Sequence, residues 1–328
     1  MERKGPLEMR EARMLGPGEQ FWGKYLISEK VQRLTRDGKN MYNLKLVDST
    51  GEMDAVVWEN CQLTGELEAG KVANFLGDVS VFNGKNQLTA KKIKVVDDDY
   101  RAFLPAPPID LAALKAEFKH QTERVSDPYL KALLNHIFTP EVRERFFEAP
   151  AAKRVHHNYR GGLLEHSLSV CRQCLNLAEG YPYLNRDLLI AGALLHDIGK
   201  MEEFEIEFAP RYTMTGKLLG HISIGAELVT RAIRELKAGG LDFPAVAELM
   251  ITHMVISHHG TLEYGSPVVP MFPEAMVLHN MDRLDAHLFV FHHKAAEGGG
   301  EDEWFTPYDN FFGQQFFTYR YAQTEDKE

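Results

Sequence analysis

The sequence is poor in cysteine and has no long apolar run, and both absences limit the class of protein. Three cysteines among 328 residues cannot all pair, and they suit the reducing cytoplasm. The longest apolar stretch, 188–195, is far shorter than the ~20 residues that cross a bilayer. Residues 1–19 mix Glu and Arg without the apolar core of a secretory signal. These features predict a cytoplasmic protein that has no membrane partner.

The chain also lacks the positive charge of a protein that binds nucleic acid through bulk electrostatics. Its formal net charge is -10, whereas neutralising a phosphate backbone requires clustered Lys and Arg. Residues 20–97 hold 11 Lys and Arg against 10 Asp and Glu, so the acidity lies in the rest of the chain. Cations bound to that part would offset some of its charge.

Residues 20–97 show the alternation of apolar and polar residues that is typical of β-strands. The alternation is interrupted by turn signals such as Asp48-Ser49-Thr50-Gly51 and by a polar segment, 59–70. The expected strands are 25–34, 41–47, 53–58, 72–82 and 87–96. Five strands with one insertion match a small Greek-key barrel of the OB type.

A proline-rich connector, 104–108, precedes a region with helical periodicity. The expected helices are 111–120, 128–137, 141–148, 162–179, 186–198, 218–237, 245–257 and 273–294. The sequence therefore predicts a multidomain protein in which an all-β OB-type barrel is followed by an all-α domain. The expected parts are an N-terminal extension (1–19), the barrel (20–97), a linker (98–110), the helical domain (111–297) and a C-terminal tail (298–328).

The tail is rich in aromatic side chains, which need burial or a stacking partner. They are Trp304, Phe305, Tyr308, Phe311, Phe312, Phe316, Phe317, Tyr319 and Tyr321. Because aromatics contribute strongly to packing, the favoured interpretation is docking onto the helical domain, or onto a second copy of the chain in a homo-oligomer. The alternative is a base-stacking platform near the active site.

Three segments of the helical region place histidine and aspartate among apolar residues. His196 and Asp197 end an apolar helix. His166 lies on an earlier helix and Asp282 on a late one. A lone histidine on an apolar face is more often a hydrogen-bonded core residue, but buried imidazoles and carboxylates together are the ligands of a metal ion. We therefore expect three helices to converge on one cation, with Asp285 orienting a ligand.

These residues resemble the HD phosphohydrolase superfamily. Its pattern is matched by His166, by Ala-Leu-Leu-His-Asp-Ile-Gly-Lys at 193–200, and by Asp-x-x-Asp at 282–285. The segment 193–200 is the most specific of the three. The resemblance implies a metal-dependent enzyme that hydrolyses a phosphate ester.

Three further histidines lie between the His196-Asp197 pair and Asp282 in the sequence, and they suggest a second metal ion. They are His221, His258 and His259. In two-metal phosphodiesterases both ions neutralise phosphoryl charge. The superfamily resemblance implies that Asp197 bridges the two ions and that these histidines complete the shell of the second.

Two basic side chains near this pattern are candidates for binding the substrate phosphate. Lys200 follows His196 by about one helical turn; a solvated surface lysine is the alternative, and the superfamily pattern favours phosphate contact. We therefore group Lys200 with His196 and Asp197 as catalytic residues. Arg160 lies beside two glycines in the segment 156–162, and a structural salt bridge is its alternative role.

The barrel region resembles OB segments of the tRNA-anticodon type, in which an Asp-x-Thr-Gly turn joins the second and third strands. OB barrels bind single strands through aromatic stacking and basic side chains. The alternative is that the aromatics belong to the core and the lysines only solubilise the barrel. The candidate residues are Asn43, Lys45, Trp58, Phe82, Lys85, Lys91 and Lys92.

An OB barrel, a proline-rich connector and an HD domain in this order resemble the YhaM-like 3′-to-5′ exoribonucleases. The resemblance covers residues 23–294, and its most typical stretch is His-His-Asn-Tyr-Arg-Gly-Gly-Leu-Leu-Glu-His at 156–166. It implies a metal-dependent exonuclease whose OB domain feeds the 3′ end of single-stranded RNA, or DNA, to the HD site.

Two other functions remain open. One is an HD nucleotidase or cyclic-nucleotide phosphodiesterase with a regulatory OB domain, and the other is a non-catalytic nucleic-acid-binding protein, against which the intact ligand set argues. A mixed His and Asp shell accepts several divalent ions. We expect two ions per site, with Mn²⁺ as the first candidate and Fe²⁺, Co²⁺, Ni²⁺, Zn²⁺ or Mg²⁺ as alternatives.

Overall fold

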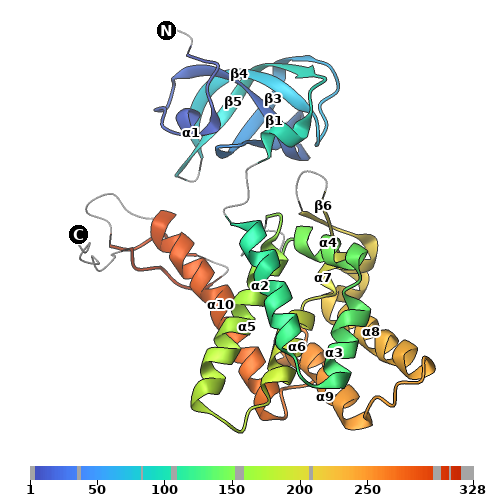
Figure 1. Ribbon diagram of the computed structural model, residues 1–328. Coiled ribbons are helices and arrows are strands. Elements are labelled where there is room, and N and C mark those ends of the chain that lie inside the picture. The colour runs from blue at the N-terminus through green and yellow to red at the C-terminus, as the bar shows by residue number, and fades with distance from the viewer. Residues whose placement is uncertain are drawn as a thin grey trace, which may run out of the picture. The chain divides into compact units, whose positions relative to one another are not determined.

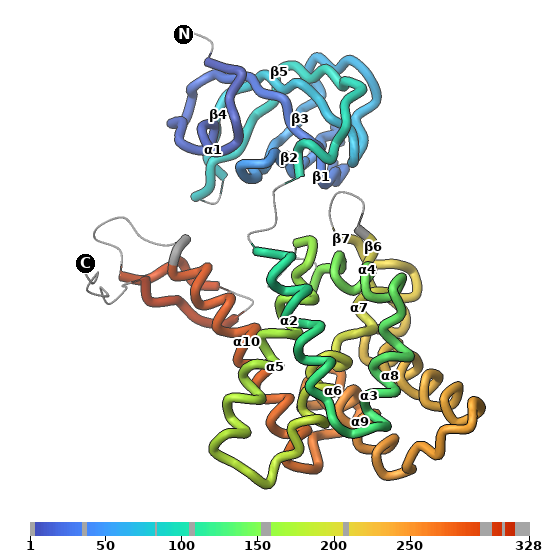
Figure 2. Tube along the Cα trace, in the orientation of Figure 1, coloured from blue at the N-terminus to red at the C-terminus, as the bar shows by residue number. Residues whose placement is uncertain are grey.

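The computed structural model describes residues 4–34, 38–82, 84–104, 109–151, 159–206, 210–297, 304–309 and 312–318. The chain divides after Pro108 into a β-rich unit and a helical unit (Figures 1 and 2). The division lies in the predicted linker, 98–110, of which residues 105–108 are outside the described ranges. The predicted fold class, an OB-type barrel followed by an all-α domain, is confirmed.

Five strands close the first unit into a barrel. Their order is β1-β2-β3-β5-β4, in which β3 and β5 are parallel and the other neighbours are antiparallel. The strands are β1 (Gln20–Leu34), β2 (Asn40–Asp48), β3 (Gly51–Thr64), β4 (Val72–Phe82) and β5 (Lys85–Val96). The predicted third strand, 53–58, is too short, because its mostly polar continuation has no alternation to detect.

The N-terminal extension packs against this barrel. Its short helix α1 (Met9–Ala12) buries Met9, whose N–H donates to Asp48 Oδ2 at 2.7 Å. The buried Tyr25 hydroxyl donates to the Leu7 carbonyl at 2.8 Å. Because a helix of four residues has no periodicity, this packing could not be predicted from the sequence.

The helical unit contains the predicted helices and a small two-stranded sheet that was not predicted. The helices are α2 (Leu111–Arg124), α3 (Pro128–Ile137), α4 (Pro140–Glu148), α5 (Gly162–Gly180), α6 (Arg186–Leu195), α7 (Lys200–Glu203), α8 (Met214–Ala238), α9 (Ala245–Ser257) and α10 (Pro273–Glu297). The sheet pairs β6 (Phe204–Ile206) with β7 (Pro210–Tyr212). Two 3₁₀ turns, η1 (Tyr100–Phe103) in the first unit and η2 (Leu262–Tyr264) here, complete the elements.

Several helix boundaries differ from the prediction, and two of these differences lie next to site residues. The predicted helix 186–198 ends at Leu195, and a turn then leads into the short helix α7. The predicted helix 218–237 begins earlier, at Met214, and is kinked at Gly220, where φ is 71° and ψ is 153°. Glycine adopts this left-handed backbone without a steric penalty, so the chain turns directly before His221.

Helix α6 lies in the middle of the helical core and is apolar on all sides. All eight residues from 188 to 195 are buried. Gly192 permits the close approach of Met254 on α9, since a Cβ at this position would lie 2.2 Å from the Met254 Cε. The C-terminal end of α6 is therefore buried, and His196 lies in the interior of the unit rather than in solvent.

Candidate metal centre

Side chains from α5, α6 and α10 meet in the interior of the helical unit. His166 and His196 are fully buried, and their Nε2 atoms are 3.3 Å apart. Asp282 Oδ1 lies 3.1 Å from the His166 Nε2 and 3.8 Å from the His196 Nε2. The structure thus brings together the three helices whose convergence on one cation was expected.

A second group of ligands lies beside the first. His221 of α8 and His258 and His259 at the end of α9 offer ring nitrogens within 4.8 Å of one another. His221 follows the kink at Gly220, and His258 is fully buried. These are the three histidines that the sequence assigned to a second ion.

Asp197 stands between the two groups and turns one carboxylate oxygen toward each. Its Oδ2 lies 3.5 Å from the His166 Nε2 and 3.3 Å from the His196 Nε2. Its Oδ1 lies 3.5 Å from the Nε2 atoms of both His221 and His258. This is the placement of a carboxylate that can bridge two cations.

All five imidazoles have their Nδ1 atoms engaged, so each can present Nε2 to the centre. An Nδ1 that contacts a carbonyl oxygen must carry the proton, which leaves the Nε2 lone pair of a neutral ring free for a metal. The Nδ1 partners are Asp285 Oδ2 for His166 (2.8 Å), the Ala193 carbonyl for His196 (2.8 Å), Glu203 Oε2 for His221 (3.2 Å), the Val255 carbonyl for His258 (2.7 Å) and the Tyr264 carbonyl for His259 (2.6 Å).

Three buried atoms at this point have no hydrogen-bond partner among the described residues. They are Asp197 Oδ1, His221 Nε2 and His258 Nε2. Unsatisfied buried polar atoms are rare in folded proteins because desolvating them costs free energy. Imidazole nitrogens and a carboxylate oxygen are donors that divalent transition metals accept. The residues present therefore fit a bound cation.

The charges around the centre set the protonation states of its groups. Burial would raise the pKa of Asp197, but the Lys200 ammonium at 2.6 Å and His196 hold this pKa well below its usual range. Burial would lower the pKa of His166, but hydrogen bonds with Asp282 and Asp285 raise it to about 10. Burial lowers the pKa of His258. Anionic Asp197 and neutral His258 are ready to bind metal, while a cation must displace a proton from His166.

Asp285 orients His166 of the first group through the ring nitrogen that faces away from the centre, as the sequence suggested. Its Oδ2 contacts the His166 Nδ1 at 2.8 Å, and its Oδ1 accepts a hydrogen bond from the Gln173 amide at 2.9 Å. Glu203 has the same role for His221, and nothing in the sequence pattern singled it out. Carboxylates behind metal-binding histidines fix the ring orientation and raise the basicity of the ligand.

Asp285→Asn is expected to weaken metal binding, because the neutral amide removes the charge that orients and polarises His166. Partners of this kind contribute about 10- to 100-fold in affinity. Titration of the metal-free protein with Mn²⁺ in a calorimeter measures the effect. Asp242→Asn, at an exposed loop position, is the matched control. Equal affinities in the two variants would show that Asp285 does not tune the site.

Gly199 has a steric role in the second group. A Cβ at this position would lie 2.1 Å from the His221 carbonyl oxygen and 2.7 Å from the Gly225 nitrogen. Both atoms belong to the backbone of α8, so they cannot move aside as a flexible side chain could. The glycine allows the segment after Asp197 to pack directly against the helix that carries His221.

Gly199→Ala is expected to lower the melting temperature by several degrees and to weaken binding of a second ion, since overpacking costs about 1–3 kcal/mol. Gly180→Ala is the control, because no atom lies within 4 Å of a Cβ there. Thermal unfolding followed by circular dichroism, with and without Mn²⁺, separates the two effects. A Gly199→Ala protein that melts like the control would contradict the close packing.

The structure places Lys200 and Arg160 against acidic partners. Lys200 is buried, and its ammonium lies 2.6 Å from Asp197 Oδ2. Arg160 forms an ion pair with Glu148, which is the structural alternative that the sequence left open. Contact of either cation with a substrate phosphate stays a prediction. Residues 156–158 of the same motif lie outside the described ranges.

The barrel candidates share the outer face formed by β2, β3, β5 and β4. Alternation turns Leu44 and Leu46 inward and Asn43 and Lys45 outward. The register places Asn43 opposite Val56, and Trp58, two residues after Val56, lies on the same face of β3. It also places Phe82 of β4 opposite Lys85 of β5. The outward residues of this face include Asn43, Lys45, Trp58, Phe82, Lys85 and Lys91.

The two aromatics of this face are not core residues. Trp58 is 43% exposed and Phe82 is 63% exposed, so the alternative of burial is wrong for both. Lys45 forms an ion pair with Glu52 at 2.7 Å, and Lys91 forms one with Asp78 at 2.5 Å. The acidic partners offset the positive charge of both lysines. Lys85 and Lys92 are exposed. Binding of nucleic acid by these side chains stays a prediction.

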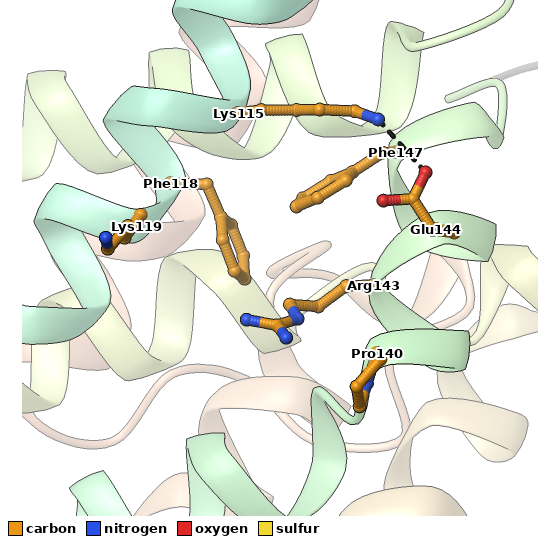
Figure 3. Close-up of a pocket in the computed structure, with 7 residues that line it drawn as sticks. All are labelled: Lys115, Phe118, Lys119, Pro140, Arg143, Glu144 and Phe147. Carbon is orange, nitrogen blue, oxygen red and sulfur yellow. Dashed lines mark hydrogen bonds and ion pairs between the residues drawn. The ribbon is translucent and has the colours of Figure 1, made fainter.

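Two cavities of the helical unit lie outside the metal centre. The first, of 250 Å³, lies between α2 and α4 (Figure 3). The Lys115 ammonium at its edge pairs with Glu144 at 3.0 Å and lies 5.1 Å from the centre of the Phe147 ring. The second, of 510 Å³, includes Ile198 and Met201 but no metal ligand.

Comparison with known proteins first defines the class. Residues 163–287 match the HD domain family and residues 27–96 match the family described as OB-fold nucleic acid binding domain. The HD match contains the six side chains of the two groups and Asp197. The chain is therefore a hydrolase of the HD type, a metal-dependent phosphohydrolase, joined to an OB-fold domain. No helix in the described part of the chain is long and apolar enough to span a membrane.

Curated relatives then identify the family. A protein of Bacillus velezensis named 3'-5' exoribonuclease YhaM is 33% identical over 279 residues, which are 83% of this chain and 87% of the relative. Proteins of the same name from Bacillus subtilis and Listeria innocua are 33% and 32% identical, over 83% and 80% of this chain and 86% and 84% of their own. The chain belongs to the YhaM family of 3'-5' exoribonucleases, which confirms the resemblance seen in the sequence.

Proposed function

We propose that this protein is a metal-dependent 3′-to-5′ exoribonuclease that removes nucleotides from the 3′ end of single-stranded RNA. The observation that carries the proposal is the Asp197 carboxylate, which faces one ligand group with each oxygen. Its unsatisfied Oδ1 and the two unsatisfied histidine nitrogens point to cations at this position. Relatives that are similar to this chain over most of their length bear the name of such an enzyme.

The ligand sets support two ions, with Mn²⁺ as our first candidate. His166, His196 and Asp282 would hold one ion, and the three later histidines would hold the other. Bound there, the ions would supply positive charge that stabilises the phosphoryl group in the transition state. The protein's own contribution is a rigid shell, because Asp285 and Glu203 fix the ring orientations and Lys200 keeps Asp197 ionised.

The barrel is proposed to hold the strand whose 3′ end enters the helical unit. Single-strand binding by OB barrels combines base stacking with basic side chains, which agrees with exposed Trp58 and Phe82 among lysines. Because stacking and phosphate contacts do not read the sugar, we expect some activity on single-stranded DNA. RNA is preferred in this proposal because the family relatives are named for RNA.

The test is incubation of a 5′-labelled single-stranded RNA with the full chain and Mn²⁺, beside a DNA of the same sequence. The expected result is a ladder of labelled products that shorten from the 3′ end, abolished by chelator. His221→Ala should be inactive. His120→Ala, an exposed histidine of α2, should be as active as the wild type. RNA that stays intact in the presence of bound Mn²⁺, or that is cut internally, would contradict the proposal.

A further inference from the structure

Helix α10 carries a second pattern besides its metal ligand. Apolar side chains recur along it with spacings of four, three, four, three and four residues, which is the 3.5-residue period of helices that pair with helices. The residues of this seam are Val277, Met281, Leu284, Leu288, Phe291 and Ala295. A regular seam of this length is the pattern expected of a helix that packs against another along one face.

Among the described residues, only the first part of the seam packs inside the helical unit. Val277 and Met281 pack against the core of the helical unit. Leu284, Leu288 and Phe291 are 44%, 57% and 46% exposed. Figures 1 and 2 show that the C-terminal half of α10 extends past the other helices of the unit, with residues 304–309 and 312–318 beside it. Within the described part of the chain, the second half of the seam thus has the pattern of a packed helix but is about half exposed.

Residues 304–309 and 312–318 pack against Phe291, one member of the seam, and leave Leu284 and Leu288 exposed. Phe316 is buried, with its ring edge-on to Phe291 at a centroid distance of 4.9 Å. Asp309 forms an ion pair with Lys294 at 3.2 Å. The same segment adds Phe305 and Tyr308, which are 54% and 61% exposed. The second half of α10 and this segment together form an arm that exposes several large apolar side chains.

We propose that this arm binds a second copy of the same chain, seam against seam, in an isologous dimer. The five exposed side chains, Leu284, Leu288, Phe291, Phe305 and Tyr308, are each about half exposed and together present roughly 500 Å² per chain. A standard interface buries ~800 Å² per partner, so flanking polar residues complete the area. A twofold axis pairs a surface with itself, and a heptad seam is complementary to its own copy.

RNA is a less suitable occupant for this surface. Successive residues of a helix point 100° apart, so Leu284 and Phe291 lie about 160–180° around α10 from Asp282, which faces the metal centre. A strand whose 3′ end reaches the centre would approach the other side of the helix. The dimer does not depend on the proposed nuclease function, since association can be measured without substrate.

Sedimentation velocity of the full chain at micromolar concentration tests the proposal. The wild type is expected at twice the 37.3 kDa of one chain. Leu284→Glu with Leu288→Glu should raise the dissociation constant about a hundredfold or more and give the mass of a monomer. Phe291 is kept in both proteins because it also holds Phe316 in place.

Leu249→Glu on α9 is the matched control, because it places the same charge at a leucine that is 70% exposed on another helix. It should remain dimeric, and all three proteins should share one melting curve at low concentration. A wild type of 37.3 kDa at every concentration would overturn the proposal. So would a double variant that stays dimeric, or one that loses binding of labelled RNA with no change in mass.

Discussion

Asp197→Asn is expected to slow RNA hydrolysis about a thousandfold or more, because metal ions contribute several kcal/mol to the transition state and each ~1.4 kcal/mol is tenfold in rate. The substitution keeps the shape of the side chain but removes the charge that faces both ligand groups. Single-turnover cleavage of labelled RNA at saturating Mn²⁺ measures the chemical step. The loss should appear in kcat rather than in KM, since the barrel is untouched.

This variant needs a stability control, because it also removes the partner of Lys200. An ammonium left buried without its carboxylate is destabilising, so the melting temperature should fall as well. Rates are therefore compared at a temperature at which circular dichroism shows the variant to be folded. Asp242→Asn, which changes an exposed aspartate, should leave both rate and stability unchanged. An Asp197→Asn rate within tenfold of the wild type would exclude a bridging carboxylate.

Trp58→Ala combined with Phe82→Ala is expected to raise the KM for long single-stranded RNA at least tenfold, since base stacking on an aromatic contributes about 1–3 kcal/mol per base. The cleavage rate at saturation should stay the same, because neither ring belongs to the metal centre. Both rings lie on the outer barrel face and are exposed, so their removal leaves no cavity in the core. Initial rates over a series of RNA lengths measure the effect.

The length series also decides what the barrel does. The KM difference should vanish for substrates too short to occupy the barrel. Trp58→Phe, which keeps an aromatic ring, should restore most of the affinity. Leu34→Ala is the control, since this leucine is 70% exposed at the end of β1. A double variant with an unchanged KM at every length would show that this face does not bind the strand.

The metal ligands could be predicted because they violate the local pattern. His166, His196 and Asp197 stand in segments that are otherwise apolar, and burial of such groups without a partner is costly. Helical periodicity places these side chains on the inward faces of their helices, which predicts that they lie close together. The barrel was predicted for a similar reason, because alternation along five strands is a local signal.

What could not be predicted depends on contacts between distant parts of the chain. Glu203 matters only because the kink at Gly220 brings His221 against it, and neither residue breaks a periodic pattern. The pairing of Arg160 with Glu148 is likewise a tertiary contact. Whether Trp58 and Phe82 were core or surface could not be read from alternation, because either face of a barrel strand accepts an aromatic.

The most direct test of the two-ion centre is anomalous diffraction from crystals grown with Mn²⁺. Two peaks are expected about 3.5–4 Å apart, one beside each oxygen of Asp197. The first should be bound by His166 and His196 and the second by His221 and His258. A single peak, or two peaks that do not share Asp197, would contradict the account.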